Sequence, residues 1–456
     1  MPFVLTSPPI VSKKREFRDY QQEAYDKFKD SDSAFLAMEM RLGKSFVAVR
    51  LSRDAWKCQR VFIFAPKIVL LAWEEELGKE GLAYHNLVGL TNEIRSVIID
   101  QNSPGYFLLN YEAVLDKRVS HAISKSPPDC TILDESTVVK NAKAKVTKFF
   151  LQSCDLFRKK ILLSGLPTPE DWSNIWSQCA ILNNGRWMGT SNFFKWLKYN
   201  STKDTYGHFF SPAQATKLRE EFRSFAYCLS RSHANLGESK IRTIRSGELP
   251  RKERKIYDKI KRDWEIDGLD IESTETNYAM VITSWMQRLC GGFLPKDECE
   301  SWKYLCVQDL LNTDLKNERV VVWCAFNDEI HRLQSLLKPA SSVAILTGET
   351  SQPDRQSAIT RFRSNGVRIL IVQQRLGKFG LDLSCANTAI YFSNSYNLEH
   401  RAQSEDRIVM PGKKEPLLYI DLITKDTVEE EIYCGLRDKK VDAKWLVARA
   451  RKVDVD

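Results

Sequence analysis

With 456 residues, of which 43% are hydrophobic and 28% charged, the chain is long enough for two or three folded domains, and its composition excludes a wholly disordered protein. Lys and Arg outnumber Asp and Glu by 68 to 59, so the net charge is +9, which permits a nucleic-acid partner if the bases gather on one surface. No apolar run approaches the ~20 residues that cross a bilayer, and the N-terminus has no basic leader, so we expect an intracellular protein with no membrane partner.

Short β-branched and aromatic runs alternate with helical patterns in the first part of the chain, as in a parallel sheet covered by helices. These runs are Ala34–Met38, Val61–Ala65, Tyr106–Leu109, Cys130–Leu133 and Lys160–Leu163. A second series comprises Val320–Cys324, Val343–Leu346, Arg368–Val372, Thr388–Phe392 and Leu417–Asp421. The sequence therefore predicts an α/β fold with two lobes, each built on a parallel sheet.

A phosphate-binding loop is predicted where the first apolar run leads into Gly43, Lys44 and Ser45 and then into a helix. A triphosphate needs a tight turn of backbone N–H groups, a lysine, and a hydroxyl for Mg²⁺, and this segment has all three. The usual pattern has glycine five residues before Gly43, where this chain has Met38. The motif alone therefore leaves open a chance Gly-Lys-Ser at the start of a helix.

The segment TILDEST, from Thr131 to Thr137, places two adjacent acids at the end of an apolar strand. Opposite a phosphate-binding lysine, Asp134 is suited to hold Mg²⁺ and Glu135 to polarise the attacking water. The alternative is an Asp-Glu pair on an ordinary surface turn. The upstream Gly-Lys-Ser favours the catalytic interpretation.

Long amphipathic patterns with few strand runs fill the stretch between the two series and predict helical insertions. We expect one lobe at 1–240, with an insertion at about 180–240, and a second at 241–456, with an insertion at about 250–300. The segment Arg186–Asn200 interleaves basic and aromatic residues, which suits stacking on nucleic acid. An amphipathic helix that buries Phe193, Phe194 and Trp196 in a local core is the favoured alternative.

From about residue 16 to residue 432, the chain resembles the Snf2-like branch of superfamily 2 helicases. The matching segments, in the family's order, are FRDYQQ (Phe17–Gln22), MEMRLGKS (Met38–Ser45), APKIVLLAWEEEL (Ala65–Leu77), LLNYEAV (Leu108–Val114), DESTVVKN (Asp134–Asn141), LSGLPTPEDWSNIW (Leu163–Trp176), VVVWCAFNDEI (Val320–Ile330), ILTGET (Ile345–Thr350) with Arg355 and Phe362 downstream, GKFGLDLSCAN (Gly377–Asn387) and QSEDRIVMPGK (Gln403–Lys413). The Lys140-Asn141 ending of the acidic motif is characteristic of Snf2-like members. So many motifs in the correct order are not a coincidence.

The resemblance implies tandem RecA-like lobes that bind ATP and Mg²⁺. It assigns Lys44 to the β- and γ-phosphates, Ser45 and Asp134 to Mg²⁺, and Glu135 to the attacking water, with Gln403 and Arg407 acting from the second lobe. The other nucleotide-contacting residues that it implies are Gln21, Arg41, Leu42, Gly43, Gly380 and Asp382. DNA contacts are expected from loops at strand ends, at Lys67, Asn110, Lys140, Asn141, Thr347, Gly348, Arg375 and Lys378. Each of these has a solvated surface role as its alternative.

The chain departs from the family pattern at four positions. The histidine of the acidic motif is Thr137, and two family glycines are replaced by Arg41 and Lys378. The fourth is Met410, which stands where the family has a second arginine facing the γ-phosphate, so Arg407 alone matches that pair. Its neighbours that could supply the missing charge are Arg401 and Lys413.

We therefore expect an ATP-dependent translocase on duplex DNA that remodels branched DNA without reading its sequence, a monomeric and compact phage or bacterial enzyme. The alternative is a nucleotide-switched DNA-binding scaffold or loader with weak ATPase activity, supported by Met38 and Met410. An RNA helicase is disfavoured by the Lys140-Asn141 ending. Eleven scattered cysteines without a CxxC pair and only six histidines give no material for a zinc site, and none is expected.

Overall fold

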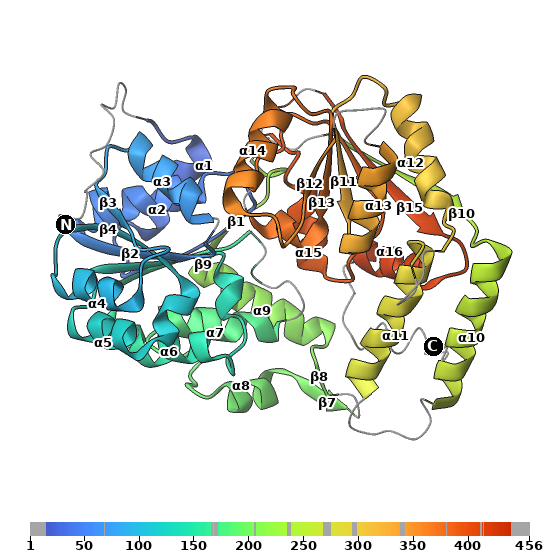
Figure 1. Cartoon of the computed structure of the whole chain (residues 1–456). Helices are drawn as coiled ribbons and strands as arrows, with labels where there is room; N and C mark the ends of the chain where they lie inside the picture. Colours follow the sequence, from blue (N-terminus) through green and yellow to red (C-terminus); the bar gives the residue numbers. More distant parts are fainter. Residues whose placement is uncertain are drawn as a thin grey trace. The chain divides into compact units, whose positions relative to one another are not determined.

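The computed structural model describes residues 15–67, 69–165, 167, 172–204, 207–234, 239–267, 275–293, 299–337, 343–379, 381–410, 413 and 415–438. The chain divides into two compact units, within 1–237 and 238–456, and each unit contains its own parallel sheet (Figure 1). Among the described residues, no helix is both long and apolar enough to cross a membrane.

The sheet of unit 1 contains all five strands that the sequence predicted for the first lobe. Its strands, in spatial order, are β3 (Tyr84–Asn86), β4 (Gly105–Asn110), β2 (Arg60–Ala65), β5 (Cys130–Asp134), β6 (Lys159–Leu163), β1 (Ser33–Met38) and β9 (Ala226–Leu229). Every neighbouring pair is parallel. All the carboxyl ends therefore meet at one edge, where ligands of such sheets bind.

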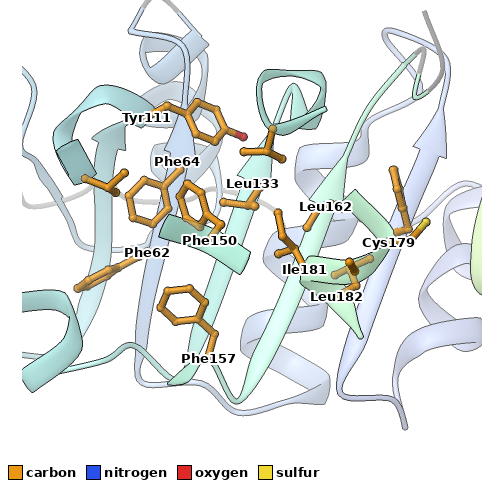
Figure 2. Packing of buried hydrophobic residues seen from close by; sticks show 14 of the residues in the cluster. Phe62, Phe64, Tyr111, Leu133, Phe150, Phe157, Leu162, Cys179, Ile181 and Leu182 are labelled. Atoms are coloured by element: carbon orange, nitrogen blue, oxygen red, sulfur yellow. The ribbon is translucent and has the colours of Figure 1, made fainter. Parts of the chain in front are cut away.

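Helices cover both faces of this sheet because its central strands are apolar on both sides (Figure 1). One face packs on α1 (Asp19–Phe28), α2 (Lys44–Arg50) and α3 (Val69–Lys79) through alternate strand residues such as Ile63. The other packs on α4 (Asn92–Asp100), α5 (Lys117–Lys125), α6 (Lys145–Ser153) and α7 (Ser173–Leu182). Figure 2 shows this second core, where Phe62 and Phe64 of β2 lie with Phe150 of α6 and Leu182 of α7.

The sheet of unit 2 contains the other five predicted strands and one more. Its order is β10 (Lys240–Gly247), β15 (Leu417–Thr424), β14 (Thr388–Tyr391), β11 (Val320–Cys324), β13 (Ile369–Gln373) and β12 (Val343–Leu346), again all parallel. One face packs on α12 (Trp302–Asn312) and α13 (Asn327–Leu337), and the other on α14 (Gln352–Arg363) and the segment around α15 (Leu398–Glu405). The prediction of two α/β lobes with parallel sheets is confirmed.

Further helices lie between α7 and α12 in the chain. In unit 1 they are α8 (Phe193–Asn200) and α9 (Pro212–Phe225), with a small hairpin of β7 (Thr202–Asp204) and β8 (Gly207–Phe209) between them. In unit 2, α10 (Arg251–Asp267) and α11 (Glu275–Cys290) lie side by side and share a core with α16 (Val428–Asp438) (Figure 1). Strand β10 pairs with β15 from Lys240 onward, so Lys240 belongs to unit 2, although the sequence placed it at the end of the first lobe.

Helix α8 corrects one detail of the favoured interpretation of Arg186–Asn200. Trp196 is fully buried and Phe193 packs against it, as expected of an amphipathic helix. Phe194 is not part of that core, because 59% of its surface is exposed. The helix therefore keeps the Phe194 ring in solvent.

Candidate functional site

The predicted nucleotide-binding residues of unit 1 lie at the carboxyl edge of its sheet. Strand β1 leads into the loop 39–43, β5 ends at Asp134, and β6 lies between them. The loop after β6 comes close to the first loop, because a Cβ atom added to Gly165 would lie 3.4 Å from Met40 Cγ. The fold thus brings together the phosphate loop after β1, the acidic motif after β5 and the motif after β6.

The loop 39–43 turns sharply at Arg41 (φ 65°) and Gly43 (φ 79°), both in the left-handed region. Gly43 directly precedes α2 and has no side chain to cap it, so the first N–H groups of that helix are available to an anion. The amide Nε2 of Gln21 donates to Leu42 O at 3.0 Å. A Cβ atom at position 43 would lie 2.3 Å from that Nε2, so glycine is required there for its space and its backbone angle.

Lys44 begins α2, and its ammonium lies against the loop that precedes it. Nζ donates to Met38 O at 2.8 Å and to Glu39 O at 3.2 Å. Met38 itself is fully buried as the last residue of β1, so at this position the side chain fills core space where the usual phosphate-loop pattern has glycine. Leu42 is also buried, whereas Ser45 is half-buried beside Lys44.

Asp134 is a buried carboxylate held by two hydrogen bonds. Trp73 Nε1 of α3 donates to its Oδ2 at 2.8 Å, and the N–H of Glu135 donates to its Oδ1 at 2.9 Å. Burial raises the pKa of this carboxyl, while the positive charge of Lys44 and the bond from Trp73 oppose the rise. A buried carboxylate near a lysine has the charge and the oxygen donors that Mg²⁺ requires.

Glu135 has a left-handed backbone (φ 50°, ψ 55°), which costs a residue other than glycine on the order of 1–3 kcal/mol. The turn that follows is fixed by α7: Ser136 Oγ donates to Gln178 Oε1 at 2.7 Å, and Ser177 Oγ donates to Val139 O at 2.6 Å. Gln178 Nε2 in turn donates to Pro167 O at 2.8 Å. The acidic motif and the loop after β6 are therefore mechanically connected through one helix.

Arg231, just after β9, is a site residue that the sequence analysis missed. It is buried, its Nη1 donates to Met40 O at 3.2 Å, and its backbone N–H donates to Glu39 Oε2 at 3.1 Å. Arg231, which follows the neighbouring strand β9, thus fixes Glu39 and Met40 at the start of the phosphate loop. Only the pairing of β9 with β1 brings Arg231 there, through contacts that span 191 and 192 residues, and no local pattern predicts such contacts.

Of the predicted DNA contacts in unit 1, Lys67 and Asn141 are exposed and Lys140 is half-buried. Asn110 is only 3% exposed, and its Nδ2 donates to Glu112 Oε2 at 2.7 Å. Its burial leaves almost no surface for a phosphate. Asn110 therefore suits a role in positioning the end of β4 better than a direct contact.

In unit 2, two predicted DNA contacts are brought together through one amide. Gln373 Oε1 accepts from Arg375 Nε at 2.8 Å and from the N–H of Gly348 at 3.2 Å. Gly348 follows Thr347 at the end of β12, beside β13. A Cβ atom at Gly348 would lie 2.5 Å from Arg375 Nη2, so glycine lets the guanidinium lie directly on the loop. Lys378 belongs to the 3₁₀ helix η5 (Gln374–Phe379), and the predicted nucleotide contact Gly380 lies outside the described residues.

Of the predicted nucleotide contacts of unit 2 that the structure describes, Gln403 and Arg407 lie on and after α15, and Asp382 precedes that helix. Gln403 is buried; its Nε2 donates to Glu399 Oε1 at 3.1 Å, and its Oε1 is buried without a hydrogen-bond partner among the described residues. Arg407 is also buried, two residues beyond the helix. Asp382 accepts from Ser384 Oγ at 2.8 Å.

The two neighbours that could replace the charge missing at Met410 are both engaged elsewhere. Arg401 is buried, and its Nη2 donates to Asp421 Oδ2 at 2.9 Å and its Nε to Glu405 Oε1 at 2.9 Å. Lys413 Nζ donates to the carbonyl oxygens of Ser384 and Ala386 at 2.7 and 2.9 Å. Met410 itself is 53% exposed. Both neighbours therefore serve the packing of unit 2.

Trp73 and Gln178 were missed for a different reason than Arg231. Trp73 lies inside a segment that the sequence analysis quoted and Gln178 lies two residues beyond another, but an apolar or amide side chain on a helix gives no sign of its partner. Their contacts with Asp134 and Ser136 span 61 and 42 residues. The sign that was available was the tryptophan itself, since a buried indole N–H needs an acceptor.

Two family descriptions match consecutive parts of the chain: "SNF2-related domain" over residues 20–291 and "Helicase conserved C-terminal domain" over residues 302–412. A human relative, the SWI/SNF-related matrix-associated actin-dependent regulator of chromatin subfamily A member 1, is 24% identical over 475 residues, which cover 93% of this chain and 43% of the relative. An ATP-dependent helicase of Mycoplasma pneumoniae is 22% identical over 96% of this chain and 42% of its own length.

A solved structure described as the Sulfolobus solfataricus SWI2/SNF2 ATPase core in complex with dsDNA is 20% identical, with coverage of 99% of this chain and 97% of that one and a TM-score of 0.44. The chain spans less than half the length of the human and Mycoplasma relatives. The SNF2-related match alone extends over more than half of the 456 residues and includes the phosphate loop, the acidic motif and the α7 connection. The chain therefore belongs to the SNF2-related family.

Proposed function

We propose that this chain is a DNA-dependent ATPase that moves along duplex DNA. The observation that carries the proposal is the arrangement at the carboxyl edge of unit 1, where Lys44 begins the helix after the phosphate loop of β1 and the buried Asp134 ends β5, two strands away in the same sheet. A lysine at the start of a helix and a strand-end carboxylate are the parts that bind and activate a nucleoside triphosphate with its metal.

ATP and Mg²⁺ fit the residues present. The turn at Gly43 leads directly into α2, whose first N–H groups suit phosphate oxygens, Lys44 supplies the compensating cation, and Ser45 and Asp134 supply a hydroxyl and a carboxylate of the kind that Mg²⁺ prefers. Bound Mg²⁺ neutralises charge on the phosphates. Glu135, adjacent to the metal ligand, orients the attacking water and accepts its proton.

Gln403 and Arg407 are proposed to act on the same nucleotide. The unsatisfied Oε1 of Gln403 supports this assignment, because a buried amide oxygen without a partner costs free energy unless a ligand satisfies it. A buried arginine that follows the helix of Gln403 suits charge stabilisation of the phosphoryl group.

Trp73→Phe tests the assignment of Asp134 to Mg²⁺. The substitution removes the indole N–H that holds Oδ2 but keeps an aromatic ring in the core, so the carboxylate loses its orientation and the proton competes better with the metal. We expect the Mg²⁺ concentration for half-maximal ATPase activity to rise roughly tenfold.

The matched control for this variant is Trp56→Phe, which removes an indole hydrogen bond to Phe28 O elsewhere in unit 1. It should leave the Mg²⁺ dependence unchanged. A Trp73→Phe enzyme with the Mg²⁺ dependence of the wild type would remove Asp134 from the metal site.

DNA is proposed to contact both units through residues at the strand ends, namely Lys67, Lys140, Asn141, Thr347, Gly348, Arg375 and Lys378. Backbone N–H groups, hydroxyls and basic side chains bind phosphates without distinguishing bases. We therefore propose binding that is independent of sequence, by a monomer, with branched DNA such as forks and four-way junctions as the remodelled substrate.

The experiment for this proposal compares forked, four-way and blunt DNA of one sequence composition. We expect ATP-dependent strand displacement or branch migration on the first two, and a DNA affinity that falls steeply with salt because phosphate contacts release counterions. Matched substrates of scrambled sequence serve as controls. Strong preference for one sequence at constant DNA structure would instead indicate a site-specific binding protein.

A nucleotide-switched scaffold with weak ATPase activity is the second candidate. The structure gives it one specific support: Arg401 and Lys413 are both engaged in packing, so neither is available to replace the arginine missing at Met410. With Arg407 as the residue that remains of the family's arginine pair, hydrolysis is proposed to be slow. Strand displacement on forked DNA separates the two candidates, because a switch does not perform it.

A further inference from the structure

The outer face of α8 carries two exposed aromatic rings among exposed lysines. Phe194 is 59% and Tyr199 is 71% exposed, and Lys195 and Lys198 of the same helix are exposed as well. The inner face is fixed by Trp196, which is fully buried and stacks on Trp187 at a centroid distance of 5.4 Å. The rings of the outer face are therefore presented on a well-anchored helix. We call these four residues, with Lys143, the α8 face.

The α8 face adjoins the segment that follows the acidic motif. Lys143 Nζ lies 5.2 Å from the centroid of the Phe194 ring. Lys143 is three residues beyond Lys140 and two beyond Asn141, which are proposed to contact DNA. A strand held at Lys140 and Asn141 can therefore reach the aromatic rings.

Charge on these segments has one sign. Residues 136–154 and 172–203 contain no Asp or Glu, whereas they contain eight basic residues, at positions 140, 143, 145, 148, 186, 195, 198 and 203. On a helical wheel, Phe194 and Tyr199 are about 140° apart, and Lys195 and Lys198 lie within the arc between them. The positions of Phe194 and Tyr199 are roughly 7.5 Å apart along the helix axis. That separation is about two nucleotide steps of one strand.

We propose that the α8 face binds the unpaired strand of branched DNA, with Phe194 and Tyr199 stacking on bases and the lysines contacting phosphates. Lone exposed apolar residues are common on protein surfaces. Two rings interleaved with lysines, on segments that contain no Asp or Glu, instead match what single-stranded nucleic acid requires, since its bases offer free faces that duplex DNA keeps stacked internally. The inference rests on the proposed function, and it names the unpaired strand as the part of a branched substrate that the α8 face binds.

The test measures binding of a forked DNA with one unpaired arm, a blunt duplex of the same length and the free single strand, without ATP. Removal of one stacking ring typically weakens binding about tenfold or more, so we expect Phe194→Ala to lower affinity for the fork and the single strand by about that factor. The double variant with Tyr199→Ala should lose more, while blunt-duplex binding stays within about twofold. A 2-aminopurine in the arm should change fluorescence with the wild type and with Phe194→Trp, but not with Phe194→Ala.

Trp285→Ala is the matched control, because it removes an aromatic ring of unit 2 that is 47% exposed. It should leave every DNA affinity unchanged. ATPase activity with blunt duplex checks that the α8 variants are folded. The same assay separates the two proposals. A wild-type protein whose ATPase activity no DNA stimulates would overturn the proposed motor function, whereas the binding of single-stranded DNA would still test the α8 face. Fork affinity that survives in the double variant, or a loss confined to RNA or to an acidic peptide, would overturn the proposal.

Discussion

Lys44→Ala should lower DNA-stimulated ATP hydrolysis by about 10³-fold, because the ammonium is the cation of unit 1 that compensates the β- and γ-phosphate charge. The fold should survive, since the lost hydrogen bonds run to two backbone carbonyls at the end of β1, Met38 O and Glu39 O, and the half-buried lysine side chain is not part of the hydrophobic core. Phosphate release with saturating duplex DNA measures the effect, and thermal unfolding checks the fold.

Lys57→Ala supplies the control for this variant, because Lys57 is an exposed lysine of the same unit, away from the loop 39–43. It should keep full activity. If Lys44→Ala kept near-normal hydrolysis, the phosphate site would have to lie elsewhere in the chain.

The second large effect is expected at Arg407. With Met410 in place of the family's second arginine, Arg407→Ala removes the remaining cation of that pair, and a loss of this kind is worth about 10³-fold or more in rate. Hydrolysis should nearly disappear at saturating duplex DNA, so that DNA binding is not the limiting step.

Met410→Arg is the informative partner of that variant. Position 410 is exposed, so an arginine fits there without disturbing the core, and we expect hydrolysis to stay unchanged or to rise. Arg401→Ala would not help to test this point, because it breaks the buried contacts with Asp421 and Glu405 and destabilises the unit. Retention of most activity by Arg407→Ala would favour the nucleotide-switched scaffold.

Much of the fold could be predicted because the central strands of both sheets are buried on both faces and read as unbroken apolar runs. Strand β10 lacks that signal: its sequence KIRTIRSG is exposed at Ile241 and Ile244, and only its pairing with β15 makes it a strand. Phe194 likewise follows the same amphipathic pattern as Phe193, and only the tertiary packing of α8 separates the buried ring from the exposed one.

The candidate site likewise contains residues that the sequence could predict and residues that only the tertiary structure reveals. Residues within one short motif, such as Gly43 and Lys44, were predictable because the chemistry requires them at adjacent positions. Trp73 and Arg231 reach Asp134 and the phosphate loop only through the order of strands and helices in the sheet. The burial of Asn110 and the packing of Arg401 also depend on contacts far apart in sequence.

ATP hydrolysis measured side by side with duplex DNA, single-stranded DNA, RNA and no nucleic acid tests the central claim most directly. We expect the duplex to stimulate the wild-type enzyme most, to the same degree for unrelated sequences of one length, and Lys44→Ala to remain at background throughout. Hydrolysis that is equally fast without nucleic acid, or stimulated by RNA in preference to duplex DNA, would contradict a DNA-driven motor.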